Sequence, residues 1–500
     1  MTKEKKQIWG SHLGESPEKL MVEFCAGRDV SLIPMADAEL VPFDLWTNRA
    51  HSIMLHRQGI MTTEQLRGVL DALATLEADW QAGKFQLDPA LEDVHMNIER
   101  FVTEKAGAEA GGRTHTGRSR NDQVACDMRL YMRSALLDLG QALTELADQL
   151  LPLAREHSKT VLPGFSHHQP AMITSWGHWL CAYNQAILRD LERVRHGYDL
   201  VNRNPLGAAA GFGTSWPIDR EHTTELLAFA RVDLNTLDCI SSRWEQEAQV
   251  AQIFGMVMNH LSLMAQDLIL LSHPYWGMVT LPDSYVTGSS IMPQKRNPDF
   301  AEVVKGKTAW VHGIVAGLTG LPRAGMSGYN RDSQLSKYAV MDVVRECRSA
   351  PTLMQGAFAN LRVNEDVMRE RLGSGFLMAA DFADALARTL GLPFRTCYNI
   401  AADAVGRVSD GGIITAQAAA EALTAAGQPP EAAQSILDDL EDPQMVVNWR
   451  QHSGAPAHFP VRVQAETMAS ELATISPWIA KEKKKLDAAY QACQQYVPEI

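Results

Sequence analysis

The sequence predicts an all-α protein built around a long central helical bundle. Apolar residues recur at spacings of three and four from Met128 to Leu153, which is the pattern of one face of a long helix. Helices of this length need partners along their whole length, which favours bundling within one chain and between chains. No convincing strand and no internal repeat is predicted. Further long segments with helical spacing follow at about residues 175–201, 244–271, 299–318 and 336–361.

The segments on either side of the bundle predict two smaller helical domains. Thr62 is suited to cap a helix over residues 66–80, and residues 91–107 carry one apolar face. From about residue 364 the helical segments become shorter and are interrupted by proline and glycine. The expected domains are an N-terminal helical domain (1–111), a central domain with the long helices (112–363) and a small C-terminal helical domain that caps the bundle (364–500).

Composition narrows the classes of function. The 500-residue chain is 46% hydrophobic and 21% charged, as expected for a soluble globular protein. Its formal net charge of -13 argues against nucleic acid as a partner, because a phosphate backbone requires a basic face. An anionic small molecule remains possible as the substrate, since a few local cations can form a positive pocket in an acidic protein.

The cysteines and the N-terminal segment predict a location. Seven cysteines are scattered without a CxxC pair, which indicates buried thiols in a reducing compartment and neither a disulfide framework nor a zinc site. The charged start MTKEKKQIWG lacks the apolar core of a signal peptide, and no run of about 18 apolar residues predicts a membrane span. We therefore expect a cytoplasmic protein without a membrane partner.

Two polar stretches have the composition of carboxylate-binding sites. Residues 113–123, RTHTGRSRNDQ, combine three arginines with three hydroxyl side chains. Residues 288–307 begin with a Gly-Ser-Ser turn, continue through Lys295 and Arg296, and enter a helix at Pro298. Hydroxyls, cations and a helix N-terminus together suit an anion. On composition alone, an ordinary solvated loop remains the alternative for both stretches.

The remaining polar segments predict no cofactor and no metal. Residues 163–170 place Ser166 next to two histidines, His167 and His168, but no HExxH motif accompanies them. Residues 204–220 are rich in glycine and alanine but have neither the P-loop nor the dinucleotide-binding pattern. Catalysis or hydrogen bonding is therefore a better interpretation of the His167–His168 pair than zinc binding. His95, alone on its helix, is expected to be structural.

The order of residues in these stretches resembles a known family. GSSIMPQKRNP (288–298) is similar to the signature loop of the fumarase/aspartase superfamily. With EDVHMNIE, HTGRSRNDQVACDMRL, PLGAAAGFGTSWPIDRE and GLPRAGMSGYNRDSQLSK, most of residues 7–400 resembles argininosuccinate lyase. The resemblance implies a three-domain, almost entirely helical fold. It also implies a homotetramer with a twenty-helix core, whose active sites each take residues from three subunits.

The resemblance also implies roles for individual residues. Ser289 matches the catalytic base, His167 the histidine paired with the acid side, and Glu302 the acidic residue that raises the basicity of that histidine. Lys295 matches the loop lysine that contacts a substrate carboxylate. The positions implied to bind substrate are Asn48, Thr116, Arg120, Asn121, Ser166, Ser290, Asn297, Tyr329, Gln334 and Lys337.

Departures from the family pattern leave the substrate open. The succinyl half of the site is kept, so the reaction type is better supported than the leaving amine. Argininosuccinate lyase, a lyase for another N-substituted aspartate such as ethylenediamine disuccinate, and a non-enzymatic crystallin-like homologue are the three alternatives. The departures are Asn48 for a serine, His167-His-Gln-Pro-Ala-Met172 for His-x-Gln-x-Ala-Gln, Arg296 for a lysine, Ser241-Ser-Arg-Trp244 for Ser-Asp-Arg-Asp, and Leu335-Ser336 for an acidic pair.

Overall fold

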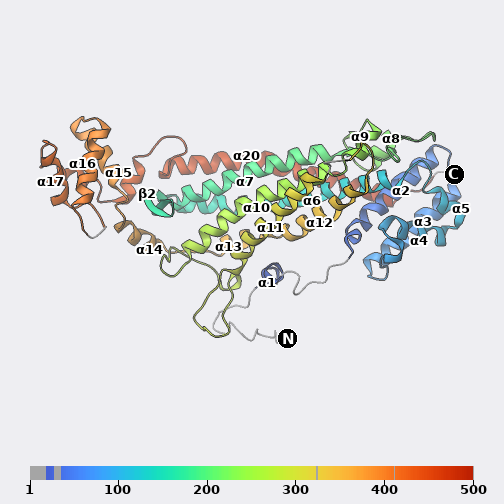
Figure 1. The fold of residues 1–500 in the computed structure, drawn as a ribbon, viewed down its shortest axis with the longest axis horizontal. Helices are drawn as coiled ribbons and strands as arrows, with labels where there is room; N and C mark the ends of the chain where they lie inside the picture. The colour runs from blue at the N-terminus through green and yellow to red at the C-terminus, as the bar shows by residue number, and fades with distance from the viewer. Residues whose placement is uncertain (1–17, 27–34, 322–324, 410–411, 499–500) are drawn as a thin grey trace.

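Long helices lie side by side along the longest axis of the molecule in the computed structural model (Figure 1). The structure describes residues 18–26, 35–321, 325–409 and 412–498. The predicted helical architecture is confirmed. The bundle consists of α6 (Arg120–Glu156), α7 (Trp176–Val201), α10 (Glu245–Leu271), α11 (Asp299–Gly320), α12 (Leu335–Cys347), α13 (Ala350–Ala359) and α20 (His458–Gln494).

Helix α6 is the backbone of this bundle. It begins with a capping box, in which the Ser119 side chain and the Asp122 side chain each accept a backbone N–H of the other residue. Its predicted apolar stripe is buried, with Leu136, Leu143 and Leu150 at 0% exposure against α7 and α20. The helix starts eight residues before the stripe, and its polar first turn contributes to the cleft described below.

Among the described residues, α10 is the one helix that is long and apolar enough to cross a membrane. Half of its apolar window is buried inside the protein, where it packs against α11 and α7. A helix at the centre of a soluble bundle has the same composition, so this is weak evidence for a span.

The helix predicted over residues 336–361 is two helices, α12 and α13. They are separated by a turn at Arg348-Ser349, and Pro351 lies in the first turn of α13. Proline lacks the N–H that a helix interior needs but fits a first turn, so the chain starts a new helix there.

The expectation of no strands is wrong for one segment. Strands β1 (Val161–Ser166) and β2 (Gln169–Ser175) form an antiparallel hairpin between α6 and α7. Buried and exposed residues alternate only weakly along these strands. The first four residues of β2 are all exposed, so hydrophobic periodicity does not predict a strand there. The other strands are two-residue pairs: β3 (Arg203–Asn204) with β4 (Arg231–Val232), and β5 (Val279–Thr280) with β6 (Arg362–Val363).

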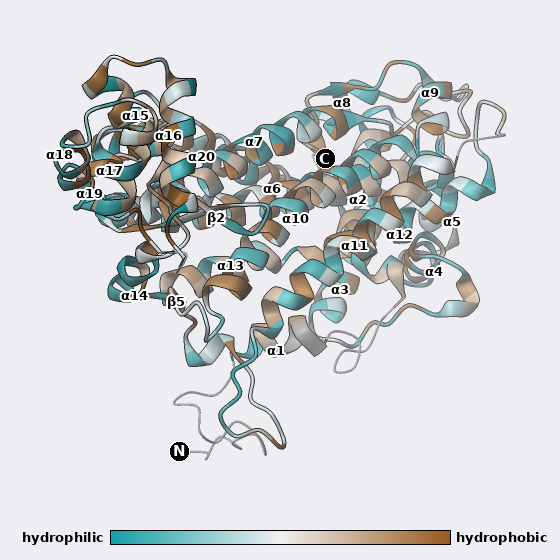
Figure 2. Ribbon diagram, turned by 60° about the vertical axis from the view of Figure 1, so that its left-hand side comes forward, coloured by the Kyte–Doolittle hydropathy of each residue, from teal (hydrophilic) through white to brown (hydrophobic). Residues whose placement is uncertain are grey.

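Smaller helices occupy both ends of the bundle (Figures 1 and 2). Helix α1 (Lys19–Ala26) lies beside the bundle, against α11 and α13. At one end of the bundle lie α2 (Val41–Arg57), α3 (Thr63–Gln81), α4 (Val94–Ala106) and α5 (Ala108–Arg113), together with two short helices that precede α10, α8 (Arg220–Leu226) and α9 (Thr236–Ser241). At the opposite end lie α14 (Glu365–Glu370), α15 (Ala379–Leu390), α16 (Phe394–Gly406), α17 (Ala416–Ala425), α18 (Ala432–Asp438) and α19 (Pro443–Asn448).

The segment predicted as the C-terminal domain has two parts. Helices α15 to α19 pack around a hydrophobic core of their own, centred on Phe382, Leu386 and Leu423. Helix α20 instead runs back along the bundle, against α6 and α7, and reaches α2 and α8. The proposed boundaries at 111 and 363 stay a prediction. The six cysteines whose side chains are described are free and buried, and residues 1–17 lie outside the described part.

Candidate active site

A polar cleft of about 360 Å³ lies at the end of the bundle where α6 begins. Its walls come from the start of α4, the start of α6, the turn before α10 and the segment before α12. Five residues implied to bind substrate line this one cleft, although they are far apart in the sequence: Arg120, Asn121, Tyr329, Gln334 and Lys337.

Two cations of the cleft are already paired with carboxylates. The Arg120 guanidinium is 2.8 Å from Asp93, and the Lys337 ammonium is 2.5 Å from Asp37. Asp93 also caps α4 by accepting the backbone N–H of Met96. These pairs fix the orientation of both cations before any ligand binds.

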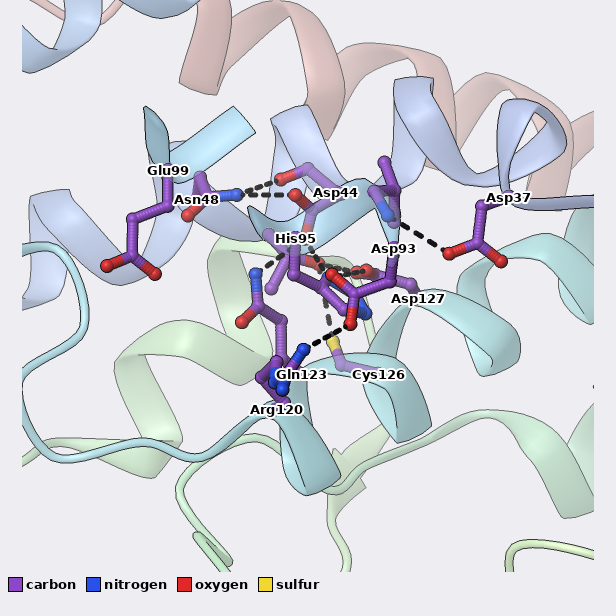
Figure 3. Close-up of polar contacts among 12 residues, drawn as sticks. Asp37, Asp44, Asn48, Asp93, His95, Glu99, Arg120, Gln123, Cys126 and Asp127 are labelled. Carbon is purple, nitrogen blue, oxygen red and sulfur yellow. Dashed lines mark hydrogen bonds and ion pairs between the residues drawn. The ribbon is translucent and has the colours of Figure 1, made fainter. Parts of the chain in front are cut away.

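A buried network of polar side chains underlies the cleft and joins α2, α4 and α6 (Figure 3). The Asp44 carboxylate accepts hydrogen bonds from His95 Nδ1 at 2.9 Å, Gln123 Nε2 at 2.7 Å and Asn48 Nδ2 at 2.9 Å. Next to it, Asp127 accepts a hydrogen bond from the Thr47 hydroxyl at 2.5 Å. Both carboxylates are fully buried. The network therefore locks the His95 ring in one orientation.

Burial and mutual repulsion shift the pKa values of the two carboxyl groups in opposite directions. Burial raises the pKa of Asp44, but the charge of His95 and the hydrogen bond from it outweigh burial and leave that pKa below its usual value. Burial and the negative charge of Asp44 raise the pKa of Asp127 well above its usual value. The pKa values of the two carboxyl groups are thus pushed apart, the outcome for two like charges sharing one site.

Asp44, His95 and Asp127 place their possible ligand atoms within 4.8 Å of one another, which is close enough for one metal ion. However, the oxygens of Asp44 already accept three hydrogen bonds, and His95 uses Nδ1 to donate one of them. The group is organised as a hydrogen-bonded network, and it carries no argument for a metal.

Asn48 and Thr116 lie beside the cleft and do not line it. Asn48 is 5% exposed, and both ends of its amide are used internally, toward Asp44 and toward Arg118 Nη2. The Thr116 carbonyl accepts a hydrogen bond from His51 Nε2 at 2.8 Å. Within one chain, both residues support the walls of the cleft.

The signature loop lies elsewhere, before α11. A bridge between Thr287 and Asn297 closes the loop, with backbone hydrogen bonds of 3.0 and 2.8 Å. Ser289 Oγ accepts the backbone N–H of Met292 at 3.1 Å and of Ile291 at 3.4 Å. Ser290 and Lys295 are exposed, and neither has an ion pair or side-chain hydrogen bond with another described residue.

The tip of the β1–β2 hairpin presents Ser166 and His167 to solvent. His167 and His168 form its two-residue turn, with φ of 53° and 58°. Positive φ at both central residues is typical of a tight hairpin turn and is unfavourable for side chains other than glycine. Glu302, in the first turn of α11, is exposed as well. No hydrogen bond or ion pair joins His167 to Glu302 in the described ranges.

Helix lengths separate these groups within one chain. Asn121 opens α6 and the hairpin follows its end, and α6 has 37 residues, about 55 Å. The loop precedes α11 and Tyr329 follows it, and α11 has 22 residues, about 33 Å. One chain therefore brings together the cleft residues but holds the loop and the hairpin at the other end of the bundle (Figure 1).

Several residues that line the cleft were not predicted from the sequence, among them His95 and Arg243. His95 was expected to be structural, yet it lines the cleft and its Nε2 has no hydrogen-bond partner in the described residues. Arg243 lines the opposite wall and was noted merely as part of a departing segment. A histidine two residues after the acidic pair Glu92-Asp93, at the start of a helix, was the available signal for His95. For Arg243 no local pattern distinguished it from a surface arginine.

A bundle of long helices with a polar cleft at one end and a serine-bearing loop at the other defines a fumarase/aspartase-type lyase. A family model described as lyase matches residues 43–313, and one described as argininosuccinate lyase C-terminal matches residues 376–447. The chain belongs to this lyase family, and the resemblance seen in its motifs is confirmed.

The named relatives agree with this family. Argininosuccinate lyase of Alkalilimnicola ehrlichii is 39% identical over 407 residues, which are 81% of this chain and 85% of that protein. Argininosuccinate lyase 1 of Mesorhizobium japonicum is 39% identical over 403 residues, with the same coverage of 81% and 85%.

Solved structures confirm the fold. EDDS lyase in complex with formate superposes with a TM-score of 0.86 at 26% identity, covering 96% of this chain and 95% of that chain. A class II fumarase from Schistosoma mansoni shares the fold, with a TM-score of 0.69 at 14% identity over 87% of this chain and 95% of that one.

Proposed function

We propose that the protein is a C–N lyase that eliminates an amine from an N-substituted aspartate and releases fumarate. The first candidate substrate is argininosuccinate, which would give arginine and fumarate and a role in amino-acid biosynthesis in the cytoplasm. The observation that carries the proposal is the combination of a preorganised cationic cleft containing Asn121 with a loop that presents Ser289. The 39% identity to argininosuccinate lyases supports the choice of amine.

The elimination begins at Ser289 in this proposal. A serine hydroxyl is a weak base, so its deprotonated form needs stabilisation. The N–H groups of Ile291 and Met292 point at Ser289 Oγ and would stabilise an alkoxide there. Ser289 removes a proton from the carbon next to a carboxylate. The two electrons of that C–H bond become the C=C bond of fumarate as the C–N bond breaks.

The charge that develops during this step is negative and lies on the substrate carboxylate. Lys295 on the loop and Arg120 in the cleft are the cations proposed to stabilise it. The electron pair of the C–N bond leaves with the nitrogen, which takes a proton from the acid side. His167, paired with Glu302, is the proposed source of that proton. Closure of the loop over the substrate would exclude water.

This chemistry requires groups from more than one chain. We propose a homotetramer in which the cleft of one chain meets the loop and the hairpin of its neighbours. The separation of these groups along α6 and α11 supports this arrangement. So do large apolar side chains exposed on the bundle, Leu263 at 59% and Trp310 at 41% exposure. Such side chains on long helices are suited to contact further helices.

A second candidate is an aminopolycarboxylate such as ethylenediamine disuccinate. EDDS lyase matches this chain over nearly its whole length. The residues next to Arg243 and Gln334 are neutral: Ser242, Trp244 and Leu335. Arg243 contacts the uncharged Asn121 and Tyr329 and pairs with no carboxylate among the described residues, which favours an amine that itself carries carboxylates.

A fumarate absorbance assay with a panel of N-substituted aspartates tests the proposal. Fumarate release from argininosuccinate selects the first candidate, and release from ethylenediamine disuccinate alone selects the second. If a folded and correctly assembled protein releases no fumarate from any compound of the panel, both candidates are contradicted.

A further inference from the structure

Arg243 occupies an unusual place in the cleft. It lies in the turn between α9 and α10 and is 8% exposed. Its Nη1 donates to Asn121 Oδ1 at 3.2 Å, and its guanidinium carbon lies 5.0 Å from the centre of the Tyr329 ring. Both neighbours are uncharged. The guanidinium is therefore held in place from two sides, and neither side compensates its charge.

No carboxylate lies within ion-pair distance of Arg243 in the described part of the chain. The neighbouring acid on α10, Glu247, is fully buried, and burial raises its pKa to about 7, so it carries only part of a negative charge near neutral pH. Burial also lowers the pKa of Arg243, with Glu247 opposing that effect. A buried cation without an anion is costly, and such groups are kept where a ligand supplies the missing charge.

The other cations of the cleft differ from Arg243 in this respect. Arg120 has Asp93 and Glu92 as partners, and Lys337 has Asp37. Under the proposed function, Arg120 and Lys295 of the loop stabilise the negative charge of the succinyl group. Arg243 is left over for a third carboxylate, which the succinyl group does not have.

We propose that Arg243 binds a carboxylate carried by the leaving amine, so that this residue sets the substrate class of the site. The inference rests on the proposed lyase function and goes further by naming the feature recognised. Argininosuccinate meets the requirement through the carboxylate of its arginine part. Aminopolycarboxylates meet it too, whereas N-alkyl aspartates and amides do not.

The test uses two matched substrate pairs with the full-length assembled protein. One pair is argininosuccinate and its analogue without the arginine carboxylate. The other is N-(carboxymethyl)aspartate and its amide, N-(carbamoylmethyl)aspartate. For the pair that turns over, we expect wild type to prefer the acid by about 50-fold in kcat/KM. The variant Arg243→Gln should reduce this preference to about 3-fold, because it raises KM for the acid far more than for the other member of the pair.

Arg331→Gln is the control, because Arg331 lines the same cleft but is exposed. It should keep most of the preference. Melting temperature and oligomer size show that each variant is folded. A preference that survives Arg243→Gln, or an equal loss on both members of a pair, overturns the inference, since an equal loss assigns Arg243 to the succinyl group.

The outcomes also separate the inference from the lyase proposal. If no compound releases fumarate, the lyase proposal fails. Calorimetric binding of N-(carboxymethyl)aspartate and its amide then repeats the comparison without turnover. Tighter binding of the acid that is lost in Arg243→Gln supports the inference, and equal binding of the two compounds rejects it.

Discussion

The two ends of the bundle differ in how their polar side chains are supported. At the cleft, Asp44 and His95 are buried, hydrogen-bonded and fixed by three helices. At the opposite end, Ser290, Lys295 and His167 are exposed on a loop and a hairpin and have no ion-pair partners in the described residues. The cleft is thus preorganised in a single chain, whereas the loop and hairpin side chains lack the surroundings that chemistry would require.

This difference indicates that the two ends of the bundle have different roles. Fixed polar groups bind and orient a ligand, because their orientation has been set during folding. An exposed loop can close over that ligand and bring a base to it. The proposed mechanism needs both halves, and each can be altered separately.

The largest expected effect comes from the exposed half. Ser289→Ala removes the proposed base and should lower kcat by about 10³-fold on whichever substrate is active. Because Ser289 makes only hydrogen bonds within its own loop, the melting temperature should stay near that of wild type. Turnover close to wild type would rule out Ser289 as the base and would leave the cleft without a known catalytic partner.

Mixing variants tests whether the two halves meet between chains. Ser289→Ala damages the loop and Asn121→Ala damages the cleft, and each alone should be nearly inactive. When the two are unfolded and reassembled together, some sites would take an intact loop from one chain and an intact cleft from another. Activity well above both parents is expected. Mixtures no more active than the parents would place each complete site within one chain.

Most of the bundle could be predicted from the sequence, because a long helix repeats its apolar pattern along its whole length. The stripe from Met128 to Leu153 predicted α6, and the four-residue capping box at its start lay in a motif noted for its charges. The β1–β2 hairpin could not be predicted in the same way. Its turn places two histidines at positive φ, where sequence preference alone would expect glycine or asparagine.

Only part of the candidate site could be predicted from the sequence, and the pairing of its charged side chains could not. The resemblance gave Arg120, Asn121, Tyr329 and Lys337, which the fold brings to one cleft. Which of the cations already has a carboxylate depends on contacts between distant segments. Lys337 pairs with Asp37, 300 positions away, and Arg243 with no carboxylate in the described residues. No local pattern contains that information.

A change in the preorganised half should affect stability as well as turnover. Asp44→Asn removes the charge that holds His95 and changes the proton balance with Asp127. Breaking a buried pair in this way costs about 3–5 kcal/mol in the free energy of unfolding. Asp138→Asn is the control, since Asp138 pairs with Lys483 at the surface and should contribute at most about 1 kcal/mol. Urea unfolding measures both. Similar small effects for the two variants would show that the network does not preorganise the cleft.

The smallest expected effect is a pH dependence of stability caused by Glu247, the buried acid four residues after Arg243. Burial raises its pKa from 4.5 to about 7 in the folded chain. Between these values the folded chain binds more protons than the unfolded chain, so the free energy of unfolding falls as pH rises through this window. The loss should be about 3 kcal/mol and complete above about pH 8. Glu247→Gln should remove this slope, while Glu245→Gln, exposed on the same turn, should keep it. If wild type and Glu247→Gln show the same pH dependence, Glu247 is ionised in the folded protein. Arg243 then already has a counter-charge, and no ligand carboxylate is needed to balance it.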